Sequence, residues 1–194
     1  LYKESKFFAE NQAAHRWEKH RGLRELSGKT ACIIGTGSVG SAIARRLRAF
    51  DVQTVGMNRS GHPVAEFDQT QPTCRLDDLL PLADLVICAM PLTAETAGLF
   101  DSVRLAKIKP GAVFVNVARG KVTDQQALVE ALQSGQLSGA VLDVFEEEPL
   151  PRSSPLWDME QVILTPHNSF VGEHNGERLF KCIKEHLYEL SKEC

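Results

Sequence analysis

The sequence predicts an α/β fold, in which a doubly wound parallel sheet lies between two helical layers. Short apolar, β-branched runs alternate along the chain with segments of helical periodicity. The runs are apolar almost throughout, which is typical of strands buried on both faces. The 194 residues are 43% hydrophobic and 24% charged, which is ordinary for a globular protein with one sizeable core. We therefore expect a three-layer αβα domain without internal repeats.

The expected strands and helices follow one another in alternation. The strands are Lys29–Gly35, Val52–Met57, Leu85–Met90, Val113–Val117, Gly139–Val144 and Val162–Thr165. The helices are Val39–Phe50, Leu76–Leu82, Ser102–Lys107 and Asp124–Ser134. The last helix is expected to have Thr123 or Asp124 as its N-cap and to end at Gly135.

Both ends of the chain differ from the middle. Residues Glu4 to Trp17 are predicted to form an amphipathic helix, followed by a charged connection to Ser27. Near the C-terminus an apolar stripe repeats at helical spacing. Its members are Leu179, Ile183, Leu187 and Leu190. Each stripe needs a partner surface, either on this domain or on a second one.

Composition argues against several functional classes. A net charge of -3 and a pI of about 6.1 give no broad positive field, so we expect neither nucleic-acid nor membrane partners. The longest apolar stretches, such as Ala112 to Val117, are far shorter than the about 20 residues that a membrane-spanning helix needs. The first ten residues mix charged and apolar side chains, unlike a signal peptide.

The odd number of cysteines without a close pair predicts reduced thiols and a cytoplasmic location. They are Cys32, Cys74, Cys88, Cys182 and Cys194.

A glycine-rich motif, G-x-G-x-x-G, lies directly between the first expected strand and the first helix of the core. Gly35 permits a tight turn, Gly37 lets the backbone approach a pyrophosphate, and Gly40 allows close packing of helix on strand. The N–H groups of Ser38 and Val39 at the helix start would face the anion. This context predicts a dinucleotide-binding Rossmann fold. The alternative is a glycine-rich turn without a ligand.

The end of the second strand indicates which dinucleotide is bound. An acid at this place accepts hydrogen bonds from the ribose 2′-OH of NAD, but the sequence here is Gly-Met-Asn-Arg-Ser. Arg59 can pair with a 2′-phosphate, and Asn58 and Ser60 can add neutral hydrogen bonds. We therefore predict that NADP is favoured over NAD. The alternative is that Arg59 is an exposed side chain with no ligand.

Three further signatures stand at the carboxyl ends of later strands, where ligands bind in open α/β sheets. They are Asn116-Val-Ala-Arg119-Gly120, Leu142-Asp143-Val-Phe-Glu-Glu-Glu148-Pro149-Leu150 and Thr165-Pro166-His167. With them the chain resembles the D-isomer-specific 2-hydroxyacid dehydrogenase family, which includes phosphoglycerate, glyoxylate, hydroxypyruvate and formate dehydrogenases or reductases. The stretch Pro91-Leu-Thr93-x-x-Thr96 fits the same family, so the resemblance extends from about Trp17 to His167.

The resemblance implies an NAD(P)-dependent oxidoreductase that transfers a hydride between nicotinamide and a small 2-hydroxy or 2-oxo acid. Such a reaction needs a cation for the substrate carboxylate, and the planar fork of Arg119 suits that task. It also needs an acid for the developing alkoxide, and the imidazole of His167 is a side chain of the type that serves as a general acid. The family pattern assigns Glu148 to hold the imidazole and stabilise its protonated form. Each residue also has an alternative without catalysis: Arg119 in a plain strand-end turn, Glu148 as a solvated acid and His167 as a loop histidine.

The resemblance also implies further cofactor contacts. Asp143 is expected beside the nicotinamide carboxamide, although it could instead cap a turn or helix. Thr93 is expected along the cofactor. The remaining members of the predicted cofactor set are Pro91, Thr96, Val117 and Ala118. No metal site is predicted.

The family's domain arrangement implies a linker helix and connection at residues 1–26, a dinucleotide-binding domain at 27–170 and a C-terminal helix at 171–194 that returns to a substrate domain. In the family a substrate domain of about a hundred residues precedes the linker helix, a typical size for a small domain. We do not recognise such a segment in this sequence. Because the substrate is normally held between the two lobes, whose closure excludes water, this chain is not expected to complete the closed site. We therefore expect cofactor binding with weak turnover or none, and a homodimer formed through this domain. The segment Asn168-Ser169-Phe170-Val171-Gly172 departs from the family's small glycine-containing turn. The sequence therefore does not predict which acid is the substrate.

Two other functions compete with catalysis. Relatives with this fold include transcriptional corepressors, which would make the chain a dinucleotide-sensing module without turnover. It could also be the nucleotide lobe of another oxidoreductase, such as an S-adenosylhomocysteine hydrolase. The Arg-Gly, Glu-Pro and Pro-His pairs argue against the second, and the set of Arg119, Glu148 and His167 favours catalysis.

Overall fold

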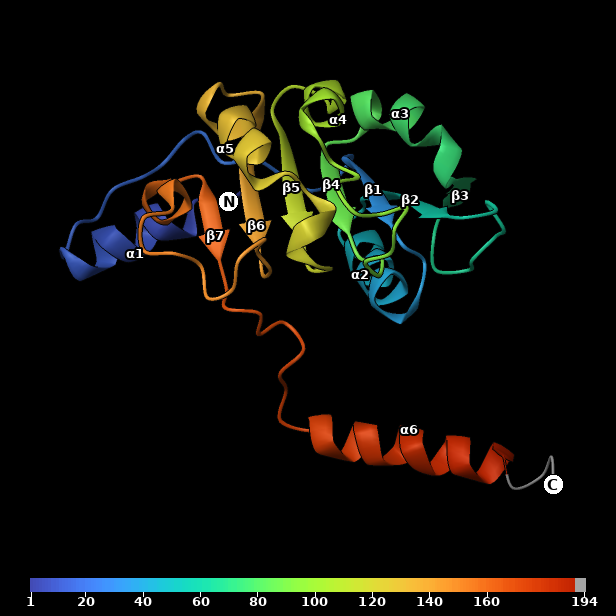
Figure 1. Cartoon of the computed structure of the whole chain (residues 1–194). Coiled ribbons are helices and arrows are strands. Elements are labelled where there is room, and N and C mark those ends of the chain that lie inside the picture. Colours follow the sequence, from blue (N-terminus) through green and yellow to red (C-terminus); the bar gives the residue numbers. More distant parts are fainter. Residues whose placement is uncertain (191–194) are drawn as a thin grey trace.

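Seven parallel strands form a single sheet in the computed structural model, which describes residues 1–190 (Figure 1). The strand order is β3-β2-β1-β4-β5-β6-β7, so the chain starts in the middle, builds one half and returns to build the other. The predicted doubly wound α/β class is confirmed. The strands are β1 (Thr30–Ile34), β2 (Gln53–Asn58), β3 (Gln69–Pro72), β4 (Leu85–Cys88), β5 (Ala112–Asn116), β6 (Leu137–Leu142) and β7 (Val162–Leu164).

Helices lie on both faces of this sheet. The helices are α1 (Ser5–Ala13), α2 (Ser38–Arg48), α3 (Leu76–Leu79), α4 (Ser102–Lys107), α5 (Gln125–Gln133) and α6 (Asn175–Leu190). In Figure 1, α3, α4 and α5 cover the upper face and α2 lies below. Short 3-10 turns occupy Thr73–Arg75, Leu80–Leu82, Gly120–Val122 and Pro155–Asp158. The result is the expected three-layer arrangement.

Alternation along the strands gives the sheet two cores. Ile33 and Ile87 point to one face, where they pack with Ala44 of α2. Ile34 and Cys88 point to the other face, under the helices α4 and α5. Because both faces are buried, the strands carry apolar side chains at nearly every position, as the sequence pattern indicated.

The six expected strands are all present, but the sequence did not predict β3. This strand is polar and its residues are exposed or half-buried. It lies at the edge of the sheet and pairs with β2 alone, so one of its sides faces solvent. A pattern search for doubly buried strands misses such an edge.

Two of the expected helical segments are shorter than predicted, and each has a local reason. The helix predicted from Glu4 to Trp17 spans only Ser5–Ala13, because the chain turns at His15, which has a φ of 54°. Its buried residue is Asn11 rather than an apolar stripe. The segment Leu76–Leu82 is a short α-helix that tightens into a 3-10 turn around Pro81, whose ring cannot continue an α-helix.

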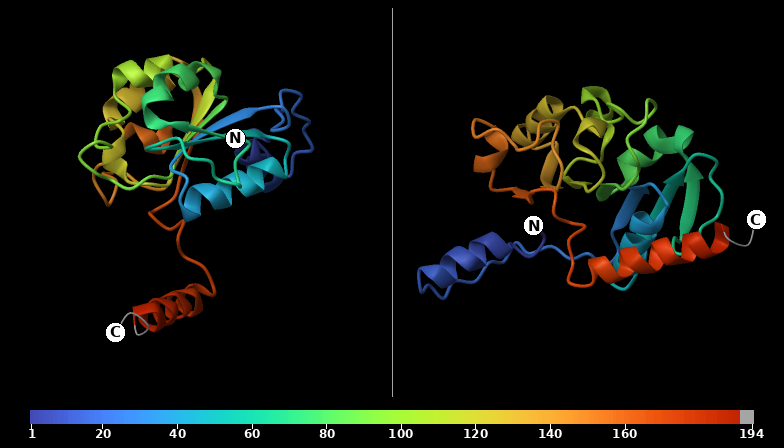
Figure 2. Two further views of the ribbon diagram at one scale, coloured as in Figure 1. Left: turned by 90° about the vertical axis from the view of Figure 1, so that its right-hand side faces the viewer. Right: turned by 60° about the horizontal axis from the view of Figure 1, so that its bottom comes forward.

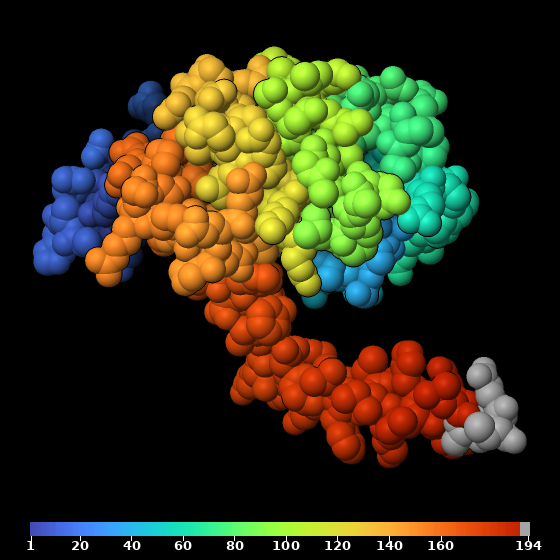
Figure 3. Space-filling view, viewed as in Figure 1, coloured from blue at the N-terminus to red at the C-terminus, as the bar shows by residue number. Residues whose placement is uncertain are grey.

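The two terminal helices lie outside the central layers. Figures 1, 2 and 3 show α6 apart from the sheet, joined to it by an extended connection. No residue of α6 is buried, and its expected apolar stripe is exposed. The apolar stripe of α6 therefore packs against no part of the described domain. In contrast α1 lies beside β7, where Lys6 Nζ donates to the Val162 carbonyl at 2.6 Å.

The described cysteines are free thiols, with Cys32 and Cys88 buried and Cys74 and Cys182 exposed. Cys194 lies outside the described residues. Among residues 1–190, no helix is long and apolar enough to cross a membrane.

Candidate active site

The carboxyl ends of β1 and β4 mark the point where the strand order reverses, which is where open α/β sheets bind ligands. A cavity of about 350 Å³ opens there. Val39 from the start of α2 lines one side of it, and the turns after β4 and β5 line the other. The predicted cofactor residues Val39, Pro91, Val117 and Ala118 all face this cavity, together with Ala89, Met90, Leu92 and Arg119.

The glycine turn after β1 combines two kinds of glycine. A Cβ on Gly35 would lie 2.6 Å from the Ala89 carbonyl oxygen, and one on Gly40 would lie 1.9 Å from the Gly35 carbonyl oxygen. Both are therefore required by the fold itself. Gly37 has a φ of -71° and no atom within 4 Å of its would-be Cβ. Nothing in the protein needs a glycine at position 37, so the space it leaves is available to a ligand.

The N-terminus of α2 suits an anion. Gly37 is the N-cap and offers no side chain to the first amides of the helix, and the first turn contains no acid. The first N–H groups of any helix lack intrahelical acceptors and carry a partial positive charge. The amides of Ser38 and Val39, beside the space at Gly37, thus fit the diphosphate of a dinucleotide.

Arg119 lies in the turn that follows β5. The Asn116 side chain holds this turn, since Oδ1 accepts from the Ala118 N–H at 3.0 Å and Nδ2 donates to the Arg119 carbonyl at 3.1 Å. The Arg119 side chain lines both the cavity at the strand reversal and a neighbouring cavity of about 510 Å³. His167 lines the second cavity as well, so the two residues share it, while Arg119 Nη1 donates to the Ala118 carbonyl at 2.6 Å.

Gly120 lets this turn approach the loop after β6. A Cβ on Gly120 would lie 1.8 Å from the Phe145 carbonyl oxygen. The signature Arg-Gly therefore reflects packing at the glycine, and this packing carries the neighbouring Arg119 against the loop that contains Glu148.

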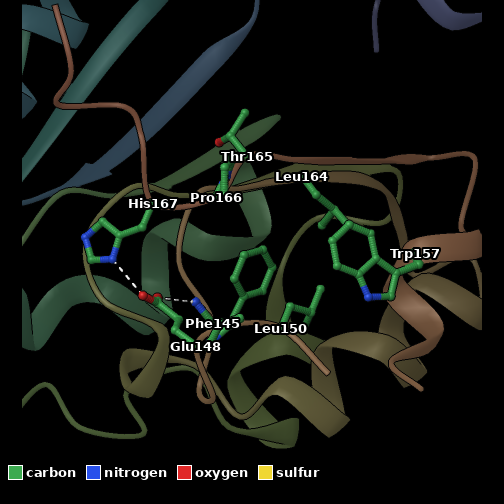
Figure 4. A pocket seen from close by; sticks show the side chains of 9 residues that line it. Phe145, Glu148, Leu150, Trp157, Leu164, Thr165, Pro166 and His167 are labelled. Carbon is green, nitrogen blue, oxygen red and sulfur yellow. Dashed lines mark hydrogen bonds and ion pairs between the residues drawn. The ribbon is translucent and has the colours of Figure 1, made fainter. Parts of the chain in front are cut away.

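Glu148 and His167 form a hydrogen-bonded pair (Figure 4). The distance from His167 Nδ1 to Glu148 Oε2 is 2.7 Å, and Glu148 Oε1 accepts from the Phe145 N–H at 2.9 Å. Partial burial raises the pKa of Glu148, but the bonds from His167 and Phe145 outweigh it, so this pKa lies below its ordinary value. An ionised carboxylate only accepts, hence Nδ1 is the donor and Nε2 is left to exchange a proton.

Asp143 fixes the loop that presents His167. Its buried carboxylate accepts from Thr165 Oγ1 at 2.6 Å, the Asn168 N–H at 2.9 Å and the Ser169 N–H at 3.1 Å. The His167 N–H donates to the Asp143 backbone carbonyl at 2.8 Å, and His167 has a left-handed φ of 51°. Asp143 thus caps this turn, which was the alternative reading of its role. Its contact with a carboxamide stays a prediction.

The predicted residues along the rest of the cofactor brace their own turns. Thr96 Oγ1 accepts from the Thr93 N–H at 2.7 Å and donates to the Pro91 carbonyl at 2.8 Å. At the end of β2, the Asn58 side chain bonds within its own loop, whereas Arg59 and Ser60 are exposed. These turns stand at the same carboxyl edge of the sheet as the glycine turn.

Two features of the site were missed from the sequence. An apolar cavity of about 570 Å³ lies beside Glu148 and His167, with Trp157, Leu150 and Phe145 among its walls (Figure 4). Phe170 shares a cavity with Arg119 and packs edge-on to His167 at 6.2 Å between ring centroids. In the sequence, the run Asn168–Gly172 stands out only as a departure from a family pattern. The aromatic residue within it, Phe170, is the signal that could have indicated a role in the site.

This arrangement has a definite chemical capacity. A guanidinium can hold a carboxylate at the mouth of a cavity where an imidazole, paired with an acid, can deliver or accept a proton. The same edge offers an uncapped helix N-terminus for an anionic cofactor. Among the described residues, no group of three His, Cys, Asp or Glu side chains could hold a metal ion.

Comparisons with known proteins identify the family of this chain. The family model described as "D-isomer specific 2-hydroxyacid dehydrogenase, NAD binding domain" matches residues 1–169. A glyoxylate/hydroxypyruvate reductase B of Citrobacter koseri is 38% identical over 186 residues, covering 93% of this chain and 57% of that protein. A glyoxylate reductase of Pyrococcus furiosus is 44% identical over 143 residues, covering 74% of this chain and 42% of that protein.

Solved structures are similar over nearly the whole chain. A probable 2-hydroxyacid dehydrogenase from Rhizobium etli, in complex with NADP, HEPES and L(+)-tartaric acid, superposes with a TM-score of 0.87 at 30% identity. The match covers 98% of this chain and 61% of that one. A D-isomer specific 2-hydroxyacid dehydrogenase family protein from Aeromonas salmonicida gives a TM-score of 0.82 at 41% identity, covering 87% of this chain and 54% of that one. The chain thus spans about half the length of the curated relatives it matches.

Proposed function

Because this chain belongs to the D-isomer specific 2-hydroxyacid dehydrogenase family, we propose that it is the NAD(P)-binding part of an oxidoreductase that interconverts small 2-oxo and 2-hydroxy acids. The observation that carries the proposal is the shared cavity of Arg119 and His167, with His167 bonded to Glu148 at 2.7 Å. A dinucleotide-binding lobe without catalysis needs no such pairing.

Each of the three side chains has a distinct task. When bound, a reduced nicotinamide supplies a hydride to the 2-oxo carbon. Arg119 holds the substrate carboxylate and polarises the carbonyl. His167 gives the proton on Nε2 to the carbonyl oxygen, which becomes the hydroxyl, and later regains a proton from solvent. Glu148 accepts from Nδ1 throughout and so stabilises the imidazolium before the transfer.

NADP is the favoured cofactor in this proposal. Arg59 is exposed at the end of β2, where a 2′-phosphate would lie, and no acid stands there to bind a ribose 2′-OH.

Self-association through this domain and a cytoplasmic location also belong to the proposal. Trp17 is 96% exposed on the N-terminal segment, so a large apolar side chain is available there for contact with a second copy. The free thiols of the described residues fit a reducing compartment.

A two-step titration tests the proposal. NADPH and NADH are titrated into the chain by fluorescence, and oxamate, an unreactive analogue of a 2-oxo acid, is then added. We expect NADPH to bind more tightly than NADH, oxamate to bind only after cofactor, and steady-state reduction of glyoxylate or hydroxypyruvate to be weak. Arg119→Ala should weaken oxamate at least about tenfold, since a charge-assisted contact is worth about 1.5–3 kcal/mol.

Lys121→Ala, which removes an exposed cation two residues along the same turn, is the matched control. Cofactor binding without any Arg119-dependent oxamate binding would favour the sensing module over the enzyme. A chain that binds neither cofactor contradicts both.

A further inference from the structure

The loop from Asn58 to His62 is a compact turn whose backbone is held from within. Asn58 Oδ1 accepts from the Gly61 N–H at 2.7 Å, and Asn58 Nδ2 donates to the His62 carbonyl at 2.9 Å. Thr70 Oγ1 on the neighbouring strand β3 donates to the Gly61 carbonyl at 3.3 Å. Asn58 therefore builds the loop, and the side chains free to meet a ligand there are those that follow it.

Three of these side chains are polar and exposed: Arg59, Ser60 and His62. Ser60 Oγ lies 3.0 Å from His62 Nδ1, so the hydroxyl and the imidazole are already side by side. No acid lies between Asn58 and His62. A hydroxyl, an imidazole and a guanidinium on one fixed turn can all donate to the same acceptor, and a phosphate monoester is an acceptor with several anionic oxygens.

We infer that His62 is a further specificity-determining residue, which contacts the 2′-phosphate of NADP(H) together with Arg59 and Ser60. The inference rests on the proposed function and adds to it a residue that the sequence pattern did not single out. NADH, which lacks this phosphate, makes no use of the contact. The imidazole thus contributes to the difference between the two cofactors and little to the affinity that they share.

The dissociation constants of NADPH and NADH for the chain test this directly. His62→Ala should weaken NADPH about tenfold, the value of one hydrogen bond to a charged group, and change NADH less than about twofold. His62→Gln, which keeps an N–H donor, should recover part of the loss. His186→Ala, at an exposed histidine of α6, is the control and should leave both constants unchanged.

A fragment titration followed by NMR places the effect on the phosphate. Adenosine 2′,5′-bisphosphate should shift the His62 imidazole resonances, and adenosine 5′-monophosphate should not. If wild type binds neither NADPH nor NADH, the proposed function itself fails. If wild type binds cofactor but His62→Ala loses both cofactors equally, or neither, this inference is overturned and the proposed function stands.

Discussion

The turn after β1 and the turn after β5 both contain a glycine at the edge of the site, but for opposite reasons. A Cβ on Gly37 would meet no atom within 4 Å, whereas one on Gly120 would lie 1.8 Å from the Phe145 carbonyl oxygen. The first region keeps space for a ligand, and the second uses the missing side chain to pack two loops together. Glycine in a motif is therefore not by itself a sign of binding, and the surroundings decide what it does.

The turn after β5, which packs against the loop of Glu148, should tolerate an added side chain less well than the turn after β1. Gly120→Ala forces a methyl group into the Phe145 backbone, which cannot yield as a flexible side chain can. We expect the free energy of unfolding to fall by about 3 kcal/mol, the upper range for overpacking. Urea denaturation measures this, with Gly176→Ala at an open position of α6 as the control. An unchanged midpoint for Gly120→Ala would show that the two turns do not differ as described.

The buried carboxylate of Asp143 gives this region a pH dependence. Burial raises the pKa of Asp143, but hydrogen bonds from Ser169, Thr165 and Asn168 outweigh it, so the folded-state pKa is low. The unfolded chain binds the proton more readily, so the stabilisation is complete above about pH 4 and is lost as pH falls through the folded-state pKa.

Asp143→Asn should accordingly cost about 2 kcal/mol near pH 7, since it sets an amide against backbone N–H donors. The difference from wild type should shrink as pH falls below about 4. Urea denaturation at a series of pH values provides the measurement. A difference that stays constant down to pH 2 would mean that the carboxylate charge does not hold the loop.

The cofactor region should show the reverse pattern, loss of binding without loss of stability. Gly37→Ala adds a methyl group where the protein has open space and where φ is ordinary. Alanine is a poorer N-cap than glycine but reduces the freedom of the unfolded chain, so the free energy of unfolding should change by less than about 1 kcal/mol. The same methyl group occupies the place where a pyrophosphate approaches the helix, and NADPH affinity should fall at least about tenfold, or about 1.4 kcal/mol. Full affinity in a stable Gly37→Ala protein would remove the basis of the comparison.

The sequence predicted the residues of the site better than their contacts. The strand-end motifs located Arg119, Glu148 and His167, because the carboxyl ends of parallel strands meet at one edge whatever the loops do. The resemblance implied the pairing of Glu148 with His167, which the structure contains. The sequence could not predict that Glu146 Oε1 accepts from the Gln125 N–H at the start of α5, because this contact depends on the path of the loop past its neighbours.

The same limit applies to the sheet and to the turns. Periodicity detects strands that bury both faces, so the polar edge strand β3 was not visible in it. The role of Asp143 as a cap depends on the left-handed backbone of His167, which brings two amides onto one carboxylate. Such a geometry follows from tertiary packing and leaves no period or spacing in the sequence.

The state of the His167 ring tests the central claim most directly. In ¹⁵N NMR of the chain, neutral His167 should carry its proton on Nδ1, because that nitrogen lies 2.7 Å from an acceptor-only carboxylate. Glu148→Gln should abolish this preference, and NADPH should shift the ring resonances of wild type, since His167 lines the cavity next to the cofactor cleft. A ring protonated on Nε2 in wild type, or one that does not respond to saturating NADPH, would contradict the assignment of this pair to the chemistry.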